Sequence, residues 1–293
     1  MSWLIIIISS YFLFAVVSLI DRYLLKGPPN PKIYTFYVGV LGISVLVLAP
    51  FVGFSAPNYF DIIFCLVCGA IYTFFLFSFF EGLKKFEASR VVPAMAGFLP
   101  VFTFIFVYFF SGFKNVFGFK ELFVFILLIL GGIIVSLDLS KKISFRSLKI
   151  SVLMSLFLSL SFILTKYIYL HLPFWTGFIW IRIGIFLTSL FFLFIKDVRK
   201  EIFSGLSSFN KKTSLVFVIN QGIGAGAVVL QNLAVALAAL VNLSIINALQ
   251  GIQYIFLFVL SLLFLKEEKN KQVIVPRVIA ILLIGAGLAI LAF

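Results

Sequence analysis

Charged residues are scarce in this sequence of 293 residues. Asp, Glu, Lys and Arg make up 11% of it, whereas they make up about 25% of an average soluble domain. Hydrophobic residues account for 63%, and the mean hydropathy is +1.24. A fold surrounded by water could not cover so much apolar surface. The composition therefore excludes a soluble enzyme, a disordered chain and a nucleic-acid-binding module, and it predicts a protein whose main solvent is lipid.

Histidine and cysteine are nearly absent as well. His171 is the single histidine, which excludes a His-based metal cluster and a Ser-His-Asp triad. Cys65 and Cys68 are too few for a disulfide framework. Their C-x-x-C spacing lies inside an apolar run, where free cysteine behaves as a small hydrophobic side chain. We therefore expect no metal and no other cofactor.

What the sequence has in abundance is long apolar runs. A helix needs about 20 apolar residues to cross the hydrocarbon core of a bilayer. Ten runs meet that length: 3–25, 33–53, 59–83, 88–111, 117–138, 148–170, 173–195, 213–237, 241–265 and 273–293. The first has neither a basic segment before it nor a clear cleavage site, so we interpret it as a retained helix. The longest connection, 196–212, is too short for a soluble domain. The predicted fold class is an all-α integral membrane protein with ten transmembrane helices.

Basic residues are distributed very unevenly over the connections. Nineteen of the 23 lysines and arginines lie in or next to the connections that follow the first, third, fifth, seventh and ninth runs. The alternate connections hold only Lys114 and Lys120. Short cytoplasmic loops carry such an excess. We therefore predict that the basic connections face the cytoplasm and that both chain ends face outward.

The two halves of the sequence resemble each other. A shift of 154 residues places Gly97 on Gly251, and a shift of 144 places Arg22 on Lys166. Each half then contains five predicted helices, and an odd number forces the second half into the membrane upside down relative to the first. Inverted repeats of this kind hold a substrate near the bilayer midplane, between the halves, and alternate its access to the two sides.

Three further features accompany the repeat. The third run passes almost without a break into the fourth through 81–89, Arg182 lies early in the second helix of a repeat, and a Leu-Lys-Glu-Glu stretch at 265–268 precedes a helix with Gly285 and Gly287. With these features the chain resembles, over essentially its full length, the ten-helix EamA-type members of the drug/metabolite transporter superfamily. The resemblance implies two EamA-like five-helix repeats, 1–139 and 147–293, in the plasma membrane of a prokaryotic cell.

Two features depart from the family pattern. Phe113 stands where the second half has Glu267. Family members also commonly carry basic residues between their second and third helices, with both chain ends inside, whereas 55–59 contains none. The family pattern and the charge distribution therefore disagree about orientation, and we follow the charges.

Arg182 is the strongest candidate for binding a substrate. Charged groups at membrane depth are costly and usually face a cavity or a partner, and Arg182 lies near the middle of its run, beside Trp180. A guanidinium suits a carboxylate or phosphate ligand through two parallel hydrogen bonds. The alternative is a buried arginine satisfied by carbonyls or by a carboxylate across the bundle. Lys166 lies nearer a helix end, where it either contributes to the cavity or extends to the interface.

Uncharged amide side chains are frequent within the eighth and ninth runs. Asn247, Gln250 and Gln253 recur every three residues, so they stay near one helix face, opposite the repeat-related fourth run. Amides also join membrane helices to one another, but we favour a cavity wall. The predicted substrate-binding or cavity residues are thus Arg182, Trp180, Lys166, Gln231, Asn232, Asn247, Gln250, Gln253, Pro93 and Gly97.

Few acidic residues lie near the membrane. Glu81 is a candidate for ion coupling, and its alternative is an interfacial ion pair with Lys84 and Lys85, one helical turn away. Asp21 and Arg22 lie at the basic side, where we expect them simply to end the first helix.

These observations predict a secondary transporter and not an enzyme. It would export a small metabolite, an amino acid or related organic compound according to the resemblance, by alternating access through a central cavity. One alternative is a flippase for a lipid-linked sugar or an amphiphile, which the superfamily also contains. An alternative of another class is a lipid-modifying membrane enzyme, although the acidic residues are scattered. The expected partners are the small-molecule substrate and membrane lipid, without nucleic acid, and the chain is expected to be a monomer or homodimer.

Overall fold

The computed structural model describes residues 2–25, 30–85, 88–112, 118–136, 145–203 and 211–265, with short pieces at 275, 278–279, 282–287 and 290. Within these residues the chain forms helices and their connections, without a strand. The predicted span 273–293 lies largely outside the described residues.

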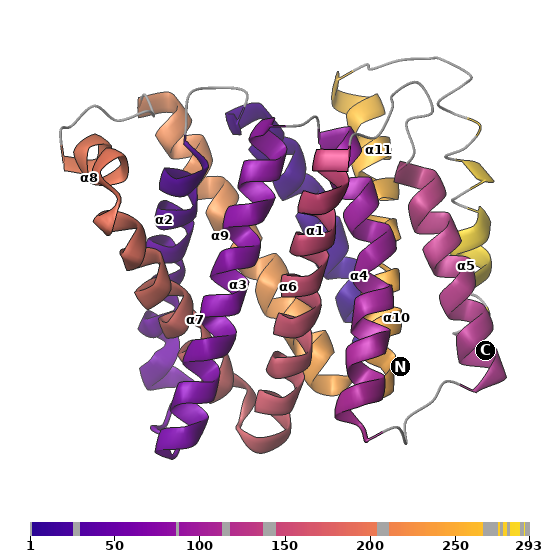
Figure 1. Cartoon of the computed structure of the whole chain (residues 1–293), viewed down its shortest axis with the longest axis horizontal. Coiled ribbons are helices and arrows are strands. Elements are labelled where there is room, and N and C mark those ends of the chain that lie inside the picture. Colours follow the sequence, from indigo (N-terminus) through magenta and orange to yellow (C-terminus); the bar gives the residue numbers. More distant parts are fainter. Residues whose placement is uncertain are drawn as a thin grey trace.

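The helices run back and forth through one bundle (Figure 1). They are α1 (Ser2–Leu25), α2 (Pro31–Gly42), α3 (Tyr59–Lys85), α4 (Ala88–Phe110), α5 (Phe119–Ser136), α6 (Phe145–His171), α7 (Phe174–Leu190), α8 (Lys196–Phe203), α9 (Lys211–Leu237), α10 (Leu243–Ala248) and α11 (Gly251–Leu265). In the described part of the chain, seven helical segments are long and apolar enough to cross a membrane. Two more apolar helices, Phe98–Phe110 and Leu122–Gly131, are shorter. The prediction of an all-α, multi-pass membrane protein is confirmed at this level.

Two of the predicted spans change helix type before they end. α2 continues as a 3₁₀ helix over Ile43–Phe51, and α7 continues as one over Phe191–Phe194. The start of α2 follows from its sequence, because Asn30 accepts a hydrogen bond from the Lys32 backbone N–H at 3.1 Å and Pro31 occupies the first turn. An Asn cap followed by Pro is a strong helix start, because the Asn side chain accepts a hydrogen bond from a free backbone N–H of the first turn and Pro has no N–H that needs a partner.

The predicted span 241–265 is interrupted, which the sequence analysis did not anticipate. α10 ends at Ala248 and α11 begins at Gly251. Between them, backbone N–H groups bond to the carbonyl three residues earlier instead of four, as in Gln250 N–H to the Asn247 carbonyl at 3.2 Å. A tighter turn of this kind often marks a hinge or a strained segment within a helix. The connection 196–212 contains the short helix α8.

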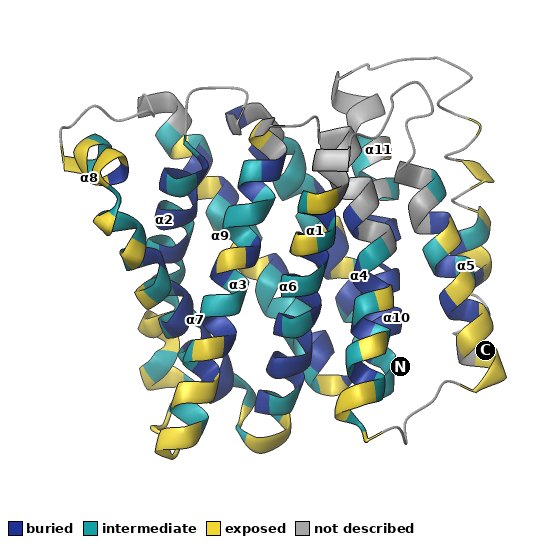
Figure 2. Ribbon diagram, viewed as in Figure 1, coloured by how far each residue is buried: buried dark blue, intermediate teal, exposed yellow. Residues whose placement is uncertain are grey.

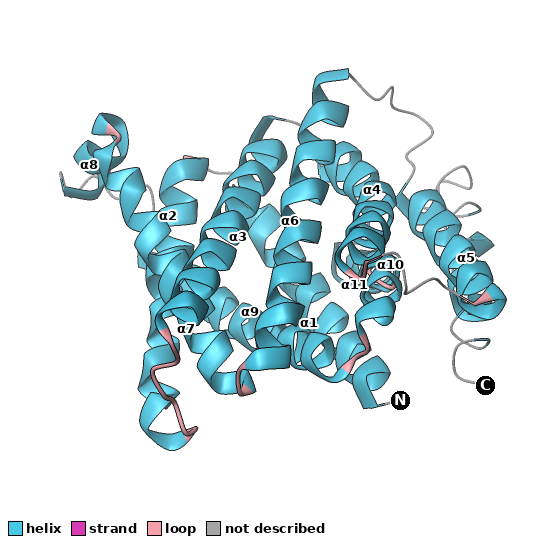
Figure 3. Cartoon of the chain, turned by 60° about the horizontal axis from the view of Figure 1, so that its bottom comes forward, coloured by secondary structure: helices cyan, strands magenta, loops and turns pink. Residues whose placement is uncertain are grey.

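Large apolar side chains cover the outside of the bundle, and the buried faces point inward (Figure 2). Phe60, Phe119 and Phe194 are each at least 79% exposed, which fits contact with lipid tails. The largest buried cluster joins α1, α4, α6 and α10 through residues such as Tyr11, Leu99, Ile163 and Ile245. α8 and α5 lie at opposite edges of the bundle (Figures 1 and 3).

Glycines bring α3 and α7 into backbone contact. A Cβ added at Gly69 would lie 2.5 Å from the Ile181 carbonyl oxygen, and one added at Gly184 would lie 2.8 Å from the Leu66 Cα. Small residues allow membrane helices to approach this closely. α7 also contacts α2, where a Cβ at Gly39 would lie 2.5 Å from Ser189. These contacts fix the helix that carries Arg182.

Candidate functional site

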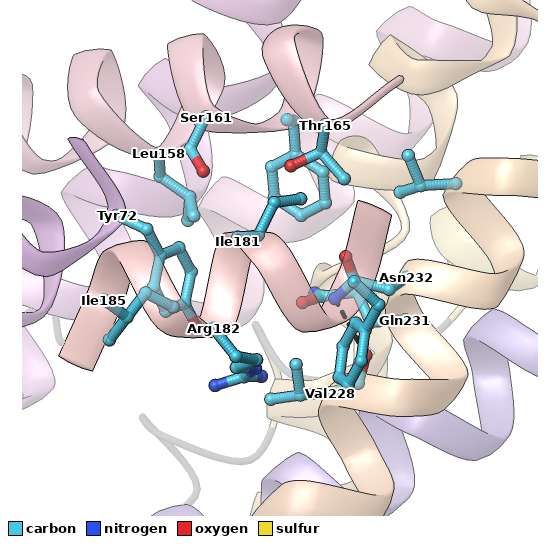
Figure 4. Close-up of a pocket in the computed structure, with 13 residues that line it drawn as sticks. Tyr72, Leu158, Ser161, Thr165, Ile181, Arg182, Ile185, Val228, Gln231 and Asn232 are labelled. Atoms are coloured by element: carbon cyan, nitrogen blue, oxygen red, sulfur yellow. Dashed lines mark hydrogen bonds between the residues drawn. The ribbon is translucent and has the colours of Figure 1, made fainter. Parts of the chain in front are cut away.

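A pocket lies inside the bundle between α3, α6, α7 and α9 (Figure 4). Its walls combine apolar side chains with a few polar groups, as is usual for small-molecule sites. The lining residues are Tyr72, Leu158, Ser161, Phe162, Thr165, Phe178, Ile181, Arg182, Ile185, Val228, Gln231, Asn232 and Val235. The pocket extends from the middle of the bundle, where Tyr72 and Arg182 lie, toward the end where α6 joins α7.

Arg182 supplies the positive charge of this pocket. Figure 4 shows its side chain extending away from α7. Its Cζ lies 5.1 Å from the centre of the Phe178 ring, within the range of a cation–π contact. Among the described residues it has neither a carboxylate partner nor a hydrogen-bond acceptor. The guanidinium donors are therefore available to a molecule in the pocket.

α9 contributes the amide side of the pocket through Gln231 and Asn232 (Figure 4). The Asn232 Oδ1 accepts a hydrogen bond from the Tyr169 hydroxyl at 2.8 Å, and its Nδ2 donates to the Val228 carbonyl at 2.9 Å. Asn232 is thus held in place by the protein. Gln231 has no hydrogen bond to any described residue, so its amide can both donate to and accept from a ligand.

The pocket is narrow in this conformation. The volume that the centres of water molecules can occupy in it is about 30 Å³. This is room for about two waters. A ligand larger than that requires the walls to move apart.

Two residues predicted from the sequence to lie at the cavity are placed elsewhere. The Trp180 Nε1 donates to the Ser55 carbonyl at 3.3 Å, and its ring packs 5.9 Å from that of Phe54, beside the connection to α3. Lys166 is 4% exposed, and its Nζ donates to the Ala236 carbonyl at 2.9 Å. Its ammonium is therefore held at the last turn of α9, and its extension to the interface stays a prediction.

The amides of α10 and α11 contact other helices instead of this pocket. The Asn247 Nδ2 donates to the Thr103 hydroxyl of α4 at 2.7 Å, and the Gln253 Nε2 donates to the Ser18 hydroxyl of α1 at 3.1 Å. Their role in a cavity stays a prediction. The side chain of Pro93 and the surroundings of Gly97 lie outside the described residues, and Glu81 is half-buried in α3.

Several buried polar atoms of this region have no partner within the described structure. They are the Ser244 Oγ, Asn247 Oδ1 and Gln250 Oε1 of α10 and the turn after it, and the Asn220 Oδ1 of α9. Each such atom costs about 1–3 kcal/mol when it is left unpaired. Ordered water is the usual partner of such atoms in folded proteins.

The sequence analysis missed a second polar site. Asp21 is buried, at 9% exposure, and its Oδ1 accepts hydrogen bonds from the Tyr34 hydroxyl at 2.5 Å and from the Asn220 Nδ2 at 2.7 Å. The expectation that Asp21 ends the first helix is wrong, because α1 continues to Leu25 and the carboxylate faces α2 and α9. The signal available in the sequence was an acidic residue and an asparagine, each inside an apolar run.

Comparison with known proteins gives the fold but no function. No protein-family model matches this chain, and no curated protein matches it. One crystal structure, described only as that of a protein, shares the fold with a TM-score of 0.74 over 100% of this chain and 98% of its own, at 12% identical residues. At that identity the likeness establishes a common architecture and nothing about chemistry.

Proposed function

We propose that this chain is a secondary transporter for a small organic metabolite with an anionic group, and that Arg182 binds that group. The observation that carries the proposal is a guanidinium inside the membrane, facing a pocket, without a carboxylate partner among the described residues. A charge at this depth is costly unless something pairs with it. A substrate carboxylate or phosphate is the partner that fits a planar guanidinium best, through two parallel hydrogen bonds.

The remaining walls suit the rest of such a molecule. Phe178 and Tyr72 offer aromatic faces, and Gln231 offers an unpaired amide for a polar substituent. Apolar side chains such as Ile181 and Val228 complete the enclosure. This combination fits an amino acid or a related organic acid, which is the substrate class implied by the resemblance to EamA-type transporters.

We propose ten spans arranged as two inverted five-helix halves, 1–139 and 147–293. The packing of the described helices supports the repeat. α1 packs against α9 and α11, whereas α6 packs against α3 and α4, and the repeat makes these pairs equivalent. A proline also stands at the start of the second helix of each half, with Pro31 as the first residue of α2 and Pro173 directly before α7, and a 3₁₀ segment follows each helix.

Alternating access follows from these two proposals together. The pocket holds only about two waters as it stands, so substrate enters when the helices around it move apart toward one side. The interrupted segment between α10 and α11 is a natural hinge for such a motion, since its backbone bonds are already rearranged. Energy comes from an ion gradient or from exchange with a second solute.

The test is ligand-induced stabilisation of the purified protein in detergent. A ligand that binds only the folded state raises the thermal midpoint as its concentration rises. We expect small carboxylates to raise the midpoint of the wild type and their uncharged amides to fail. Arg182→Ala should remove the effect, Arg182→Lys should keep part of it, and Arg199→Ala on the exposed helix α8 should leave it unchanged. Stabilisation of Arg182→Ala equal to that of the wild type would remove Arg182 from the binding site.

A further inference from the structure

The carboxylate of Asp21 lies outside the Arg182 pocket, nearer the end of the bundle where α1 ends and α2 begins. Asp21 is one turn before the end of α1, and Tyr34 is one turn after the start of α2. These helix ends flank the first basic connection, whereas the pocket extends toward the junction of α6 with α7. α9 contributes to both places, because it carries Asn220 in its first half and Gln231 in its second half.

Among the described residues, the surroundings of Asp21 contain hydrogen-bond donors but no counter-ion. Tyr34 is the titratable group that contacts it, and Asn220 is the contacting group on α9. Neighbouring α11 and α3 add the uncharged Gln253, bonded to Ser18 of α1, and Phe80, packed on the Tyr34 ring. None of the described lysines and arginines forms an ion pair with Asp21. A carboxylate removed from water is expensive unless it is paired or protonated.

The cluster also lacks one donor. The Asn220 Oδ1 is completely buried and has no hydrogen-bond partner among the described residues, although the same amide touches Asp21 through its Nδ2. A proton on the Asp21 carboxyl converts that group from an acceptor into a donor. Protonation therefore removes the buried charge and supplies the O–H that the cluster is missing.

We propose that Asp21 is the proton-binding site that couples transport to a proton gradient. Asp21 belongs to the first half and Asn220 to the second, so the bond between them forms only while α1 and α9 are closed together. When these helices part, Asp21 loses the Asn220 bond and gains water, which changes its affinity for a proton. Proton uptake and opening of this end are thereby linked. This inference rests on the proposed transport function, but it makes a claim about Asp21 that needs no substrate.

A metal cation fits this cluster poorly, which is why a proton is the coupling ion. Both groups that reach the Asp21 Oδ1 present hydrogen atoms to it, and a bound cation would face those positive ends. In the described residues no three Asp, Glu, His or Cys side chains come together to hold a metal.

The first experiment measures protonation of Asp21 directly. Infrared spectra of the purified protein are recorded at acidic and alkaline pH, and the C=O stretch of protonated carboxyl groups is followed. We expect a band that is present in the wild type and in Asp61→Asn but absent in Asp21→Asn. Asp61 is the control, because it also lies in a helix and accepts a hydrogen bond from an asparagine, Asn58, but it is partly exposed. Tyr34→Phe removes one donor to the anion, so the midpoint of the band should move to higher pH by about one unit. An unchanged set of bands in Asp21→Asn would overturn the proposal.

The second experiment measures the link to opening. A single cysteine at Val17, which faces Gly224 of α9, is labelled with a maleimide in a background free of Cys65 and Cys68. We expect the labelling rate, relative to Asp21→Asn at the same pH, to change several-fold between acidic and alkaline solution. An identical pH profile with and without Asp21 would sever the link. Failure of the transport proposal would instead appear as missing stabilisation by any carboxylate, with both of these results intact.

Discussion

Lys166 and Arg182 are two cations inside the membrane on neighbouring helices, and the structure treats them differently. The Lys166 ammonium donates to the Ala236 carbonyl, which lies one residue before the end of α9. The last four carbonyls of a helix have no partner within it, and a cation there also faces the negative end of the helix dipole. Arg182 contacts an aromatic ring and no described acceptor. Lys166 therefore caps the end of α9, and Arg182 is the charge that we propose binds a ligand.

Replacing Lys166 should therefore affect stability more than binding. We expect Lys166→Met to lower the free energy of unfolding by about 1–2 kcal/mol, because the end of α9 loses its cap and a dipole contact. Lys166→Arg should recover part of the loss. Thermal unfolding in detergent measures the effect, and the carboxylate-induced shift should be the same in all three proteins. Loss of that shift in Lys166→Met, at unchanged stability, would assign Lys166 to the site instead.

The amides of α10 give a second prediction at this scale. Asn247→Leu removes the bond to Thr103 but also removes the unpaired Oδ1, and interhelical bonds in membranes average about 0.6 kcal/mol. Expression and thermal midpoint should therefore stay close to wild type in Asn247→Leu and Gln250→Leu. We expect ligand affinity to change more than abundance, because the sequence predicts that these amides form a cavity wall. Unchanged affinity in both variants would leave them as contacts between helices.

A single site residue could be predicted from the sequence only where its residue type is rare in its surroundings. Arg182 stood out because a charge is unusual inside an apolar run. Tyr72, which lines the same pocket, did not stand out, because the chain contains 10 tyrosines and 40 phenylalanines. The Asp21 cluster joins positions 13 and 199 residues apart. Only the packing of α1 against α2 and α9 brings them together, and no local pattern encodes that.

For the helices, the length of an apolar run predicted well that a helix forms there, but it did not predict whether that helix is continuous. Runs such as 59–83 and 148–170 became α3 and α6 with ends shifted by a few residues. The break after Ala248 was not predictable, because Leu249 and Gln250 have ordinary helix propensity. The break is supported by tertiary partners, among them the Tyr11 hydroxyl, which donates to the Ile246 carbonyl at 2.7 Å. That contact comes from a residue 235 positions away.

Gly69 lies where α3 and α7 cross, and a side chain at this position would push the two helices apart. Gly69→Ala places a methyl group where the Ile181 carbonyl lies at 2.5 Å and the Ile185 nitrogen at 2.6 Å. Both are backbone atoms, so the helices must separate and Arg182 must move with α7. We expect at least about 2 kcal/mol of lost stability, or loss of the folded protein.

Gly222→Ala is the matched control for that substitution. Gly222 also lies within a helix, but a Cβ there meets nothing within 4 Å. Alanine has a higher helix propensity than glycine, so this variant should be at least as stable as the wild type. Thermal unfolding of the two variants side by side measures the difference. Equal stability would show that α3 and α7 can move apart without cost.

At the scale of the whole molecule, the fold and the chemistry are separable. A solved structure shares this architecture over the full chain while 88% of its aligned residues differ, as 12% identity implies. The architecture therefore depends on apolar faces and small residues at crossings, which many sequences supply. The charges of Arg182 and Asp21 are chemistry that this likeness does not address, and we propose that each is explained by what it binds.

The orientation of the bundle is the last prediction, and the arrangement of the helices sharpens it. The described helix ends next to the basic connections, namely the ends of α1 and α3 and the starts of α2, α6 and α9, lie together at the top of Figure 1. Short loops with many lysines and arginines stay in the cytoplasm, so this end should face inward and the chain ends outward. Single cysteines at Ser144, Ser207 and Asn58, in a background free of Cys65 and Cys68, are exposed on intact cells to an impermeant thiol reagent. We expect labelling at Asn58 alone. Strong labelling at Ser144 and Ser207 with none at Asn58 would reverse the bundle, and Asp21 would then take its proton from outside the cell.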